Sequence, residues 1–204
     1  MIARSRGLAA VMLLPFVLAL SGCASNDSTS APATTATASA TSATIASTAP
    51  SGTGGSGSRT RLEGFKEVTV TVVDADGQTR QHCLLLADTE PLRQRGLMFV
   101  EDETLGGYDG MLFVFQCDSG GGFWMKNTRL PLSIAYVAAD GRTVSTTDMA
   151  PCPDSNPNCP SYPAAGRYRY AVEVPQGQLG RVGVSETSKL TVGEQTCAGV
   201  PVAN

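Results

Sequence analysis

The sequence lacks the signatures of the commonest catalytic sites. It contains one histidine, His82, no G-x-S-x-G or phosphate-loop pattern, and no dinucleotide-binding G-x-G-x-x-G after a predicted strand. It also has no C-x-x-C pair of the thiol redox type. Adjacent strand residues point to opposite faces, so His82 and its neighbour Cys83 cannot form a catalytic dyad within one strand. We therefore expect His82 to face solvent, and we expect no cofactor.

Basic residues are scarce as well. The chain has 15 Lys and Arg against 18 Asp and Glu, which gives a formal net charge of −3. These charges are dispersed along the sequence, without the basic patch that marks a nucleic-acid surface. We therefore expect no nucleic-acid partner.

A long apolar run is absent too, and the one short run stands near the N-terminus. Arg4 and Arg6 precede the apolar stretch Leu8–Leu20. That stretch is too short to cross about 30 Å of hydrocarbon, which needs about 20 apolar residues. Residues 1–22 are therefore predicted to be a signal peptide rather than a membrane-spanning helix.

Leu20-Ser21-Gly22-Cys23 resembles the bacterial lipobox, in which the cysteine is acylated and becomes the new N-terminus. The alternative is an ordinary signal peptide followed by a chance cysteine. Two acyl chains suffice for stable anchoring. We expect a palmitate-type lipid anchor on Cys23 and an extracytoplasmic location on the bacterial cell membrane.

The segment that follows Cys23 has little to build a core from. Residues 24–60 are almost entirely Ser, Thr, Ala, Gly and Pro. Such a composition does not bury enough apolar surface to offset its ordering entropy. Residues 23–60 are predicted to be a disordered tether with a reach of roughly 30–35 Å. Residues 61–204 remain as one β-rich domain.

Within that domain the pattern is mostly strand and turn. Val68, Val70 and Val72 alternate with polar residues, which is typical of a half-buried strand. A turn at residues 74–77 leads to a second strand through Cys83–Leu86. Further strands are expected at Met111–Gln116, Phe123–Thr128, Leu132–Val137, Thr143–Thr147, Tyr168–Val174 and Lys189–Val192.

One short helix is predicted over Glu90–Arg95. Asp88 or Thr89 would cap its start, and Gly96 would end it. About eight short strands with one such helix favour a mainly β fold, a β-sandwich or a barrel.

Five cysteines follow Cys23, and an exported domain lies in a disulfide-permissive compartment. Several pairings are open. Cys152 and Cys159 flank a proline-rich loop, where a disulfide would contribute about 2–3 kcal/mol. A bond between Cys83 and Cys197 would hold the C-terminal end and would leave Cys117 over. A zinc site would need four convergent ligands and would dismantle these pairs.

Several ordered motifs carry a resemblance to a known family. They are Gly96-Leu97-Met98, Gly110–Phe115, Phe123–Thr128, Pro131-Leu132, Asp140-Gly141 and Tyr170–Gly177. Over residues 66–193 the chain is similar to the bacterial domain of unknown function 192 family. The resemblance implies a jelly-roll-like β-sandwich, often exported, and implies no activity. One position departs from it, because Ser133 stands where the family commonly has Asp.

A binding site is predicted around the only tryptophan. On an extended strand Trp124 and Lys126 would share a face, and Gly120–Gly122 just before them would permit the close approach of a ligand. The alternative is that Trp124 packs inside while Lys126 extends to solvent. We expect non-catalytic binding of an envelope glycan or a partner protein. The residues assigned to this site are Arg95, Trp124, Lys126, Asn127 and Glu173.

Two other functions stay open. Glu173 would serve an envelope polysaccharide hydrolase, with Asp148 as its acid/base partner, or would instead form a salt bridge with Arg95 or Lys126. Methionine thioethers are soft ligands for Cu(I), although core filling is their commoner role. The methionines concerned are Met98, Met111, Met125 and Met149.

Overall fold

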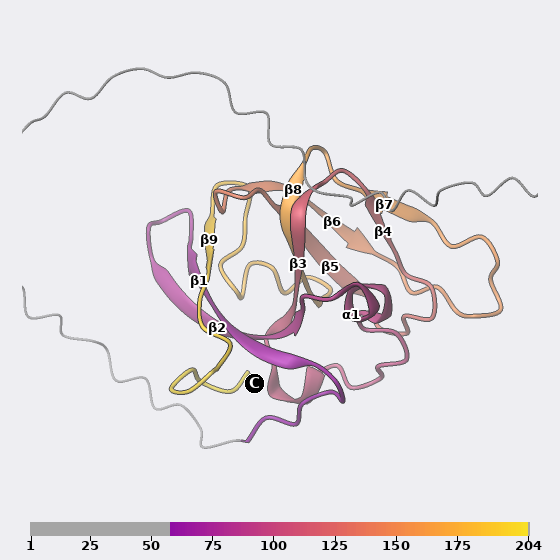
Figure 1. Ribbon diagram of the computed structural model, residues 1–204, viewed down its shortest axis with the longest axis horizontal. Helices are drawn as coiled ribbons and strands as arrows, with labels where there is room; N and C mark the ends of the chain where they lie inside the picture. The colour runs from indigo at the N-terminus through magenta and orange to yellow at the C-terminus, as the bar shows by residue number, and fades with distance from the viewer. Residues whose placement is uncertain (1–57, 204) are drawn as a thin grey trace, which may run out of the picture. The chain divides into compact units, whose positions relative to one another are not determined.

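The computed structural model describes residues 58–203, which form a domain built mainly of strands (Figure 1). The predicted signal peptide, Cys23 and nearly all of the predicted tether lie outside the described residues. Thr60, at the end of that segment, donates its backbone N–H to the carbonyl of Gly106 at 2.8 Å. None of the helices in residues 58–203 has the length and apolarity to cross a bilayer.

The elements follow one another with short connections. Their bounds are β1 Lys66–Val73, β2 Thr79–Ala87, α1 Glu90–Arg95, the 3-10 helix η1 Leu105–Gly107, β3 Gly110–Ser119, β4 Gly122–Trp124, β5 Leu132–Val137, β6 Thr143–Met149, β7 Ser161–Pro163, β8 Tyr168–Pro175 and β9 Lys189–Val192. The mainly β fold class with one short α-helix is confirmed.

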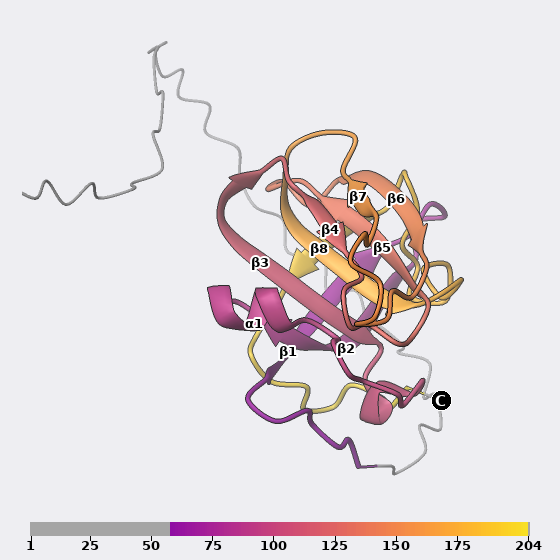
Figure 2. The same ribbon diagram turned by 90° about the vertical axis from the view of Figure 1, so that its right-hand side faces the viewer.

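Seven strands form one mixed sheet in the order β6-β5-β8-β3-β2-β1-β9, and β4 pairs with β7 in a separate ribbon. Only β2 and β3 are parallel, and a parallel pair needs a long crossover. The crossover carries α1 and η1, and α1 lies beside β3 (Figure 2). Arg93 of α1 donates to the Val114 carbonyl of β3 at 2.8 Å. The sheet is not closed into a barrel. Its ends meet where Leu190 of β9 donates to the carbonyl of Gly141, in the β5–β6 turn, at 2.8 Å, and where Arg142 and Lys189 form an isolated bridge.

Alternation along the strands gives the large sheet a buried cluster on each face. Met111, Ile134 and Ala171 belong to one cluster, which Leu97 and Met125 also join. The other cluster is built around Leu112, Ala135, Val172, Val174 and Val182. Both faces are therefore covered, and the first is the face that carries the predicted site.

The predicted strand Phe123–Thr128 is wrong beyond Trp124. Thr128 donates its backbone N–H to the Met125 carbonyl at 2.9 Å, and Asn127 has a φ of 58°. The chain therefore turns instead of staying extended, so Trp124 and Lys126 do not share a strand face. The short strand β7, which pairs with β4, was not predicted.

Two disulfides join cysteines that both lie within residues 58–203. Cys83 of β2 is bonded to Cys197, with 5.6 Å between their Cα atoms, and Cys152 is bonded to Cys159, at 5.8 Å. The first ties the segment after β9 to the centre of the large sheet. The second closes the proline-rich loop before β7. None of the cysteines in the described part of the chain is a free thiol, Cys117 included.

Candidate functional site

A narrow cleft of about 40 Å³ lies between the end of α1 and β4. Gly96 to Met98 line one side, Phe123 and Trp124 line the other, and Phe113 and Glu173 of the large sheet also contribute. Gly96 ends α1 with a φ of 47°, and a Cβ there would lie 3.3 Å from the Phe113 ring. Because Gly96 has no side chain, the end of α1 can lie close to Phe113 of β3.

Glu173 is the buried polar group of this cleft. It lies on β8 opposite Met111 of β3 and Ile134 of β5, within the apolar cluster of that face. Its side chain makes no hydrogen bond or ion pair with any residue in the range 58–203, and only 4% of the residue is exposed. Burial raises the pKa of its carboxyl from 4.5 to about 8. Glu173 is therefore largely protonated at neutral pH and offers both a donor and an acceptor.

Trp124 lies at the mouth of the cleft and is 58% exposed. Its neighbour Phe123 packs inward, with ring centroids 4.9 Å from Phe113 and 5.7 Å from Tyr136. Because successive side chains of β4 point to opposite sides, anchoring Phe123 in the core turns Trp124 outward. The alternative in which Trp124 packs inside is therefore wrong.

Arg95 lines the same cleft, but its charged group is used elsewhere. The guanidinium carbon lies 4.2 Å from the centroid of the Phe65 ring, and Nη2 donates to the Glu63 carbonyl. The predicted salt bridge between Arg95 and Glu173 is therefore wrong.

Lys126 and Asn127 do not line the cleft. Lys126 Nζ forms an ion pair with Asp154 at 3.3 Å and donates to the Asn156 carbonyl at 3.2 Å, so its pairing with Glu173 is also wrong. The backbone carbonyl of Asn127 accepts the backbone N–H of Phe99 at 2.9 Å. The side-chain Oδ1 of Asn127 is buried and has no hydrogen-bond partner in the described region. The structure thus brings together Arg95, Trp124 and Glu173 only.

Glu173 and Asp148 lie on opposite faces of the large sheet. Ser133 of β5 is in register with Asp148 of β6 and with Val174 of β8. Glu173 is in register with Ile134, the next residue of β5, so its side chain points the other way. The predicted acid/base couple of these two carboxyls is therefore wrong.

The methionines mostly fill the core. Met111 and Met149 are completely buried and Met125 is 1% exposed, all three in the same apolar cluster. Met98 lines the cleft beside Gly96 and Leu97. Their burial favours core packing over the copper interpretation.

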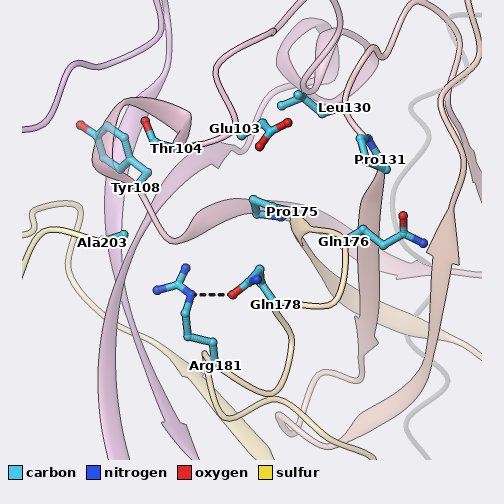
Figure 3. Close-up of a pocket in the computed structure, with 10 residues that line it drawn as sticks. All are labelled: Glu103, Thr104, Tyr108, Leu130, Pro131, Pro175, Gln176, Gln178, Arg181 and Ala203. Carbon is cyan, nitrogen blue, oxygen red and sulfur yellow. Dashed lines mark hydrogen bonds between the residues drawn. The ribbon is translucent and has the colours of Figure 1, made fainter.

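A larger pocket of about 370 Å³, which the sequence did not predict, lies at the end of β8 (Figure 3). It is lined by Pro131, Pro175, Gln176 and Gln178, together with Glu103, Tyr108 and Arg181. Two of the motifs that carry the family resemblance, Pro131-Leu132 and Tyr170–Gly177, contribute to this wall. These two motifs were the sequence feature that could have indicated this pocket, but the sequence analysis did not connect them with a site.

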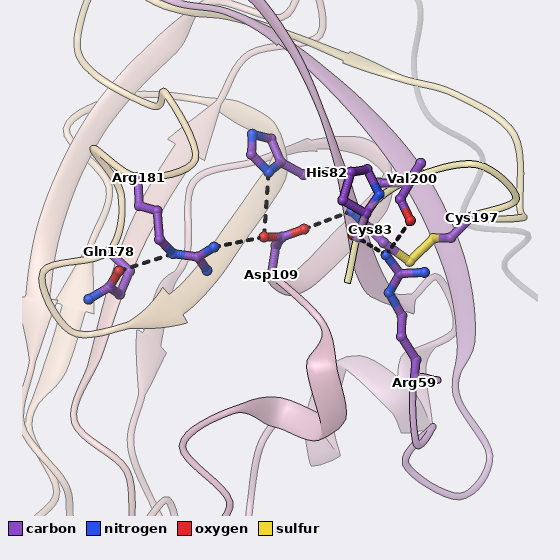
Figure 4. Close-up of polar contacts among 9 residues, drawn as sticks. Arg59, His82, Cys83, Asp109, Gln178, Arg181, Cys197 and Val200 are labelled. Atoms are coloured by element: carbon purple, nitrogen blue, oxygen red, sulfur yellow. Dashed lines mark hydrogen bonds and ion pairs between the residues drawn. A yellow bond between two sulfur atoms is a disulfide. The ribbon is translucent and has the colours of Figure 1, made fainter. Parts of the chain in front are cut away.

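Asp109 organises a buried polar cluster beside this pocket (Figure 4). Its Oδ1 lies 3.0 Å from Arg181 Nη1 and 3.5 Å from His82 Nδ1, and its Oδ2 accepts the backbone N–H of Cys83 at 3.0 Å. Burial alone would raise the pKa of Asp109, but the hydrogen bonds from His82 and Cys83 and the charges of His82 and Arg181 outweigh it. The pKa of Asp109 is therefore below its ordinary value.

His82 belongs to this cluster, so the expectation that it faces solvent is wrong. Only 9% of the residue is exposed, and its Nε2 is buried without a hydrogen-bond partner among residues 58–203. Pairing with Asp109, a residue 27 positions later, explains why sequence pattern did not reveal it.

These features define a class of protein, a mainly β domain with a buried acid of raised pKa in a narrow cleft and a separate, larger pocket at the end of β8. The chain belongs to the DUF192 family, described as "Uncharacterized ACR", whose model matches residues 71–192. None of the curated proteins matches the chain.

Two solved structures share the fold. One is a protein from Sinorhizobium meliloti 1021, provisionally described as a transcription regulator. It is 27% identical with a TM-score of 0.53, and the match covers 63% of this chain and 95% of that one. The other is a protein of unknown function from Novosphingobium aromaticivorans DSM 12444. It is 28% identical with a TM-score of 0.53, and the match covers 67% of this chain and 94% of that one.

Proposed function

We propose that this protein is a lipid-anchored, extracytoplasmic binding protein that holds a polysaccharide of the cell envelope at the cleft between Trp124 and Glu173. One observation carries the proposal. A protonated acid without a hydrogen-bond partner in the described region lines a cleft whose mouth carries an exposed tryptophan.

The dimensions of the cleft fit one sugar hydroxyl. A water-sized group needs a cavity of roughly 10–15 Å³ or more, so about 40 Å³ accepts a hydroxyl but excludes a sugar ring. The ring would instead stack on the face of Trp124 at the mouth. The inserted hydroxyl would both donate to and accept from the neutral carboxyl of Glu173, which satisfies a polar group that is otherwise buried alone.

Binding fits this geometry better than hydrolysis. Glycoside hydrolases generally place two carboxyl groups about 5 to 9.5 Å apart across the scissile bond. Glu173 is the only Asp or Glu among the described residues that line the cleft, and Asp148 lies on the other face of the sheet.

The disulfides support an extracytoplasmic location, because such bonds persist mainly in oxidising compartments. The lipobox resemblance at Cys23 supports a membrane anchor. Both features support a binding domain that would lie within reach of envelope polysaccharides.

The test is calorimetric titration of the full chain, purified in detergent, with soluble fragments of envelope polysaccharides. We expect a fragment that binds the wild type to lose at least about tenfold in affinity with Trp124→Ala and with Glu173→Gln. Phe99→Ala is the matched control, because Phe99 is 59% exposed and does not line the cleft. Equal binding by Trp124→Ala and the wild type contradicts the site, and binding only to an envelope protein contradicts the polysaccharide.

A further inference from the structure

The larger pocket at the end of β8 carries charges of opposite sign. Figure 3 shows Glu103 and Arg181 apart, on opposite sides of the pocket, with Pro175 between them. In the described part of the chain, Glu103 has no hydrogen bond or ion pair from its carboxylate. The pocket therefore offers one unpaired acid facing one base.

Arg181 is held in place before any ligand arrives. Its Nη1 is bound by Asp109 at 3.0 Å and its Nε donates to Gln178 Oε1 at 3.1 Å (Figure 4). Asp109 is in turn fixed by Cys83 and His82. Nη2 of Arg181 has no partner among residues 58–203, so a rigid guanidinium keeps free N–H donors. A preorganised arginine binds a carboxylate with little loss of side-chain entropy.

A simple anion would gain little here. Asp109 lies against Arg181 and balances much of its positive charge, while Glu103 repels an anion from the other side. A ligand with a carboxylate at one end and an ammonium at the other satisfies both walls. Pro175 offers apolar surface between the two ends, Leu130 and Pro131 add apolar surface on the side of Glu103, and the amide of Gln176 offers polar contacts.

We propose that this pocket is a second binding site, which takes short peptides that carry a free amino group and a free carboxyl group. The carboxylate binds Arg181, and the ammonium binds Glu103. The volume of about 370 Å³ lies within the usual range of small-molecule pockets, roughly 300–1,000 Å³. This inference is independent of the polysaccharide cleft, because Arg181 and Glu103 do not line that cleft.

The test is titration of the full chain in detergent with L-alanyl-L-alanine, followed by calorimetry. We expect saturable binding with a Kd of roughly 0.1–1 mM. Acetylating the amino group or amidating the carboxyl group should each weaken binding at least about tenfold. Absence of binding by the free dipeptide overturns the proposal. Equal binding by the capped peptides does so as well, and inorganic phosphate that binds in place of the dipeptide indicates a plain anion site instead.

Glu103→Gln supplies the decisive variant, because Glu103 is exposed and its replacement should leave the fold intact. It should weaken the free dipeptide about tenfold and leave the N-acetylated dipeptide unchanged. Glu186→Gln, another exposed acid outside the pocket, is the matched control and should bind as the wild type does. Arg181→Gln should also lose the free dipeptide. Because it leaves Asp109 less well paired, its result counts only where thermal unfolding shows a folded domain. Loss of affinity in Glu186→Gln equal to that in Glu103→Gln overturns the site.

Discussion

The hydroxyl of Ser133 on β5 donates to Asp148 Oδ1 on the neighbouring strand β6 at 2.5 Å. The same hydroxyl accepts the backbone N–H of Gly177 at 2.8 Å, just after β8. Ser133 thus links the carboxylate of Asp148 to the turn after β8 by two hydrogen bonds. The family resemblance leads us to expect Asp at position 133. In this chain the acid is instead Asp148, which is paired with Ser133 on the neighbouring strand.

Exchanging these two residues should preserve stability better than either change alone. Ser133→Asp places a carboxylate at a buried position, opposite the exposed carboxylate of Asp148, and should cost about 1–3 kcal/mol of unfolding free energy. Adding Asp148→Ser removes the repulsion and should recover most of that loss. Urea unfolding of the single and double variants measures the coupling, and strictly additive effects would contradict the interpretation.

The buried carboxyl of Glu173 should make stability fall as pH rises. Its pKa is raised from 4.5 to about 8 by burial, so the folded state binds the proton more tightly than the unfolded state. The contribution is complete below about pH 4.5 and is lost as pH rises through about 8. Within that window the slope from this group approaches roughly 1.4 kcal/mol per pH unit. Chemical unfolding across the window should show a flatter profile for Glu173→Gln, and an unchanged slope in that variant would refute the assignment.

The two disulfides should differ in their contribution to stability. Cys83 and Cys197 are 114 residues apart in the sequence, whereas Cys152 and Cys159 are 7 apart. The chain-entropy model then assigns about 4–5 kcal/mol to the long loop and about 2–3 kcal/mol to the short one. Replacing each pair with serines and measuring thermal unfolding compares them directly, each pair serving as the control for the other. A larger loss from the short loop would run against this order.

Cys23→Ser should abolish membrane attachment. Without the thiol no diacylglycerol could be attached. The apolar stretch Leu8–Leu20 is too short to cross the bilayer and hold the chain in its place. Incorporation of labelled palmitate and fractionation of cells check this, with Phe99→Ala, a change at an exposed residue of the domain, as the control that should keep its label. Label retained in Cys23→Ser would exclude the proposed anchor.

Local patterns predicted most of the fold. Alternation in Val68–Val72 and the helix signals around Glu90–Arg95 are short-range features that depend on residues a few positions apart. The segment after Trp124 escaped this reasoning. Asn127 adopts a positive φ there, a conformation that periodicity does not encode. The predicted strand Phe123–Thr128 therefore extends too far.

The candidate site was predicted only in part, because residue types can be read from the sequence but contacts between distant segments cannot. Trp124 and Glu173 were identified as residue types that suit binding, but whether each is exposed or buried depends on what packs against it. The pairing of His82 and Arg181 with Asp109 joins segments 27 and 72 residues away in the sequence. Spacing along the chain carries no record of such contacts.

Alternation, turn residues and ordered motifs are properties of the linear chain, so they were enough to predict a mainly β domain of this family. The raised pKa of Glu173, the exposure of Trp124 and the positions of Glu103 and Arg181 in one pocket became visible only in the folded domain. A pKa and an ion pair depend on surroundings in three dimensions. Those surroundings are assembled here from strands as distant as β2 and β8, and from loops that touch only once the sheet has formed.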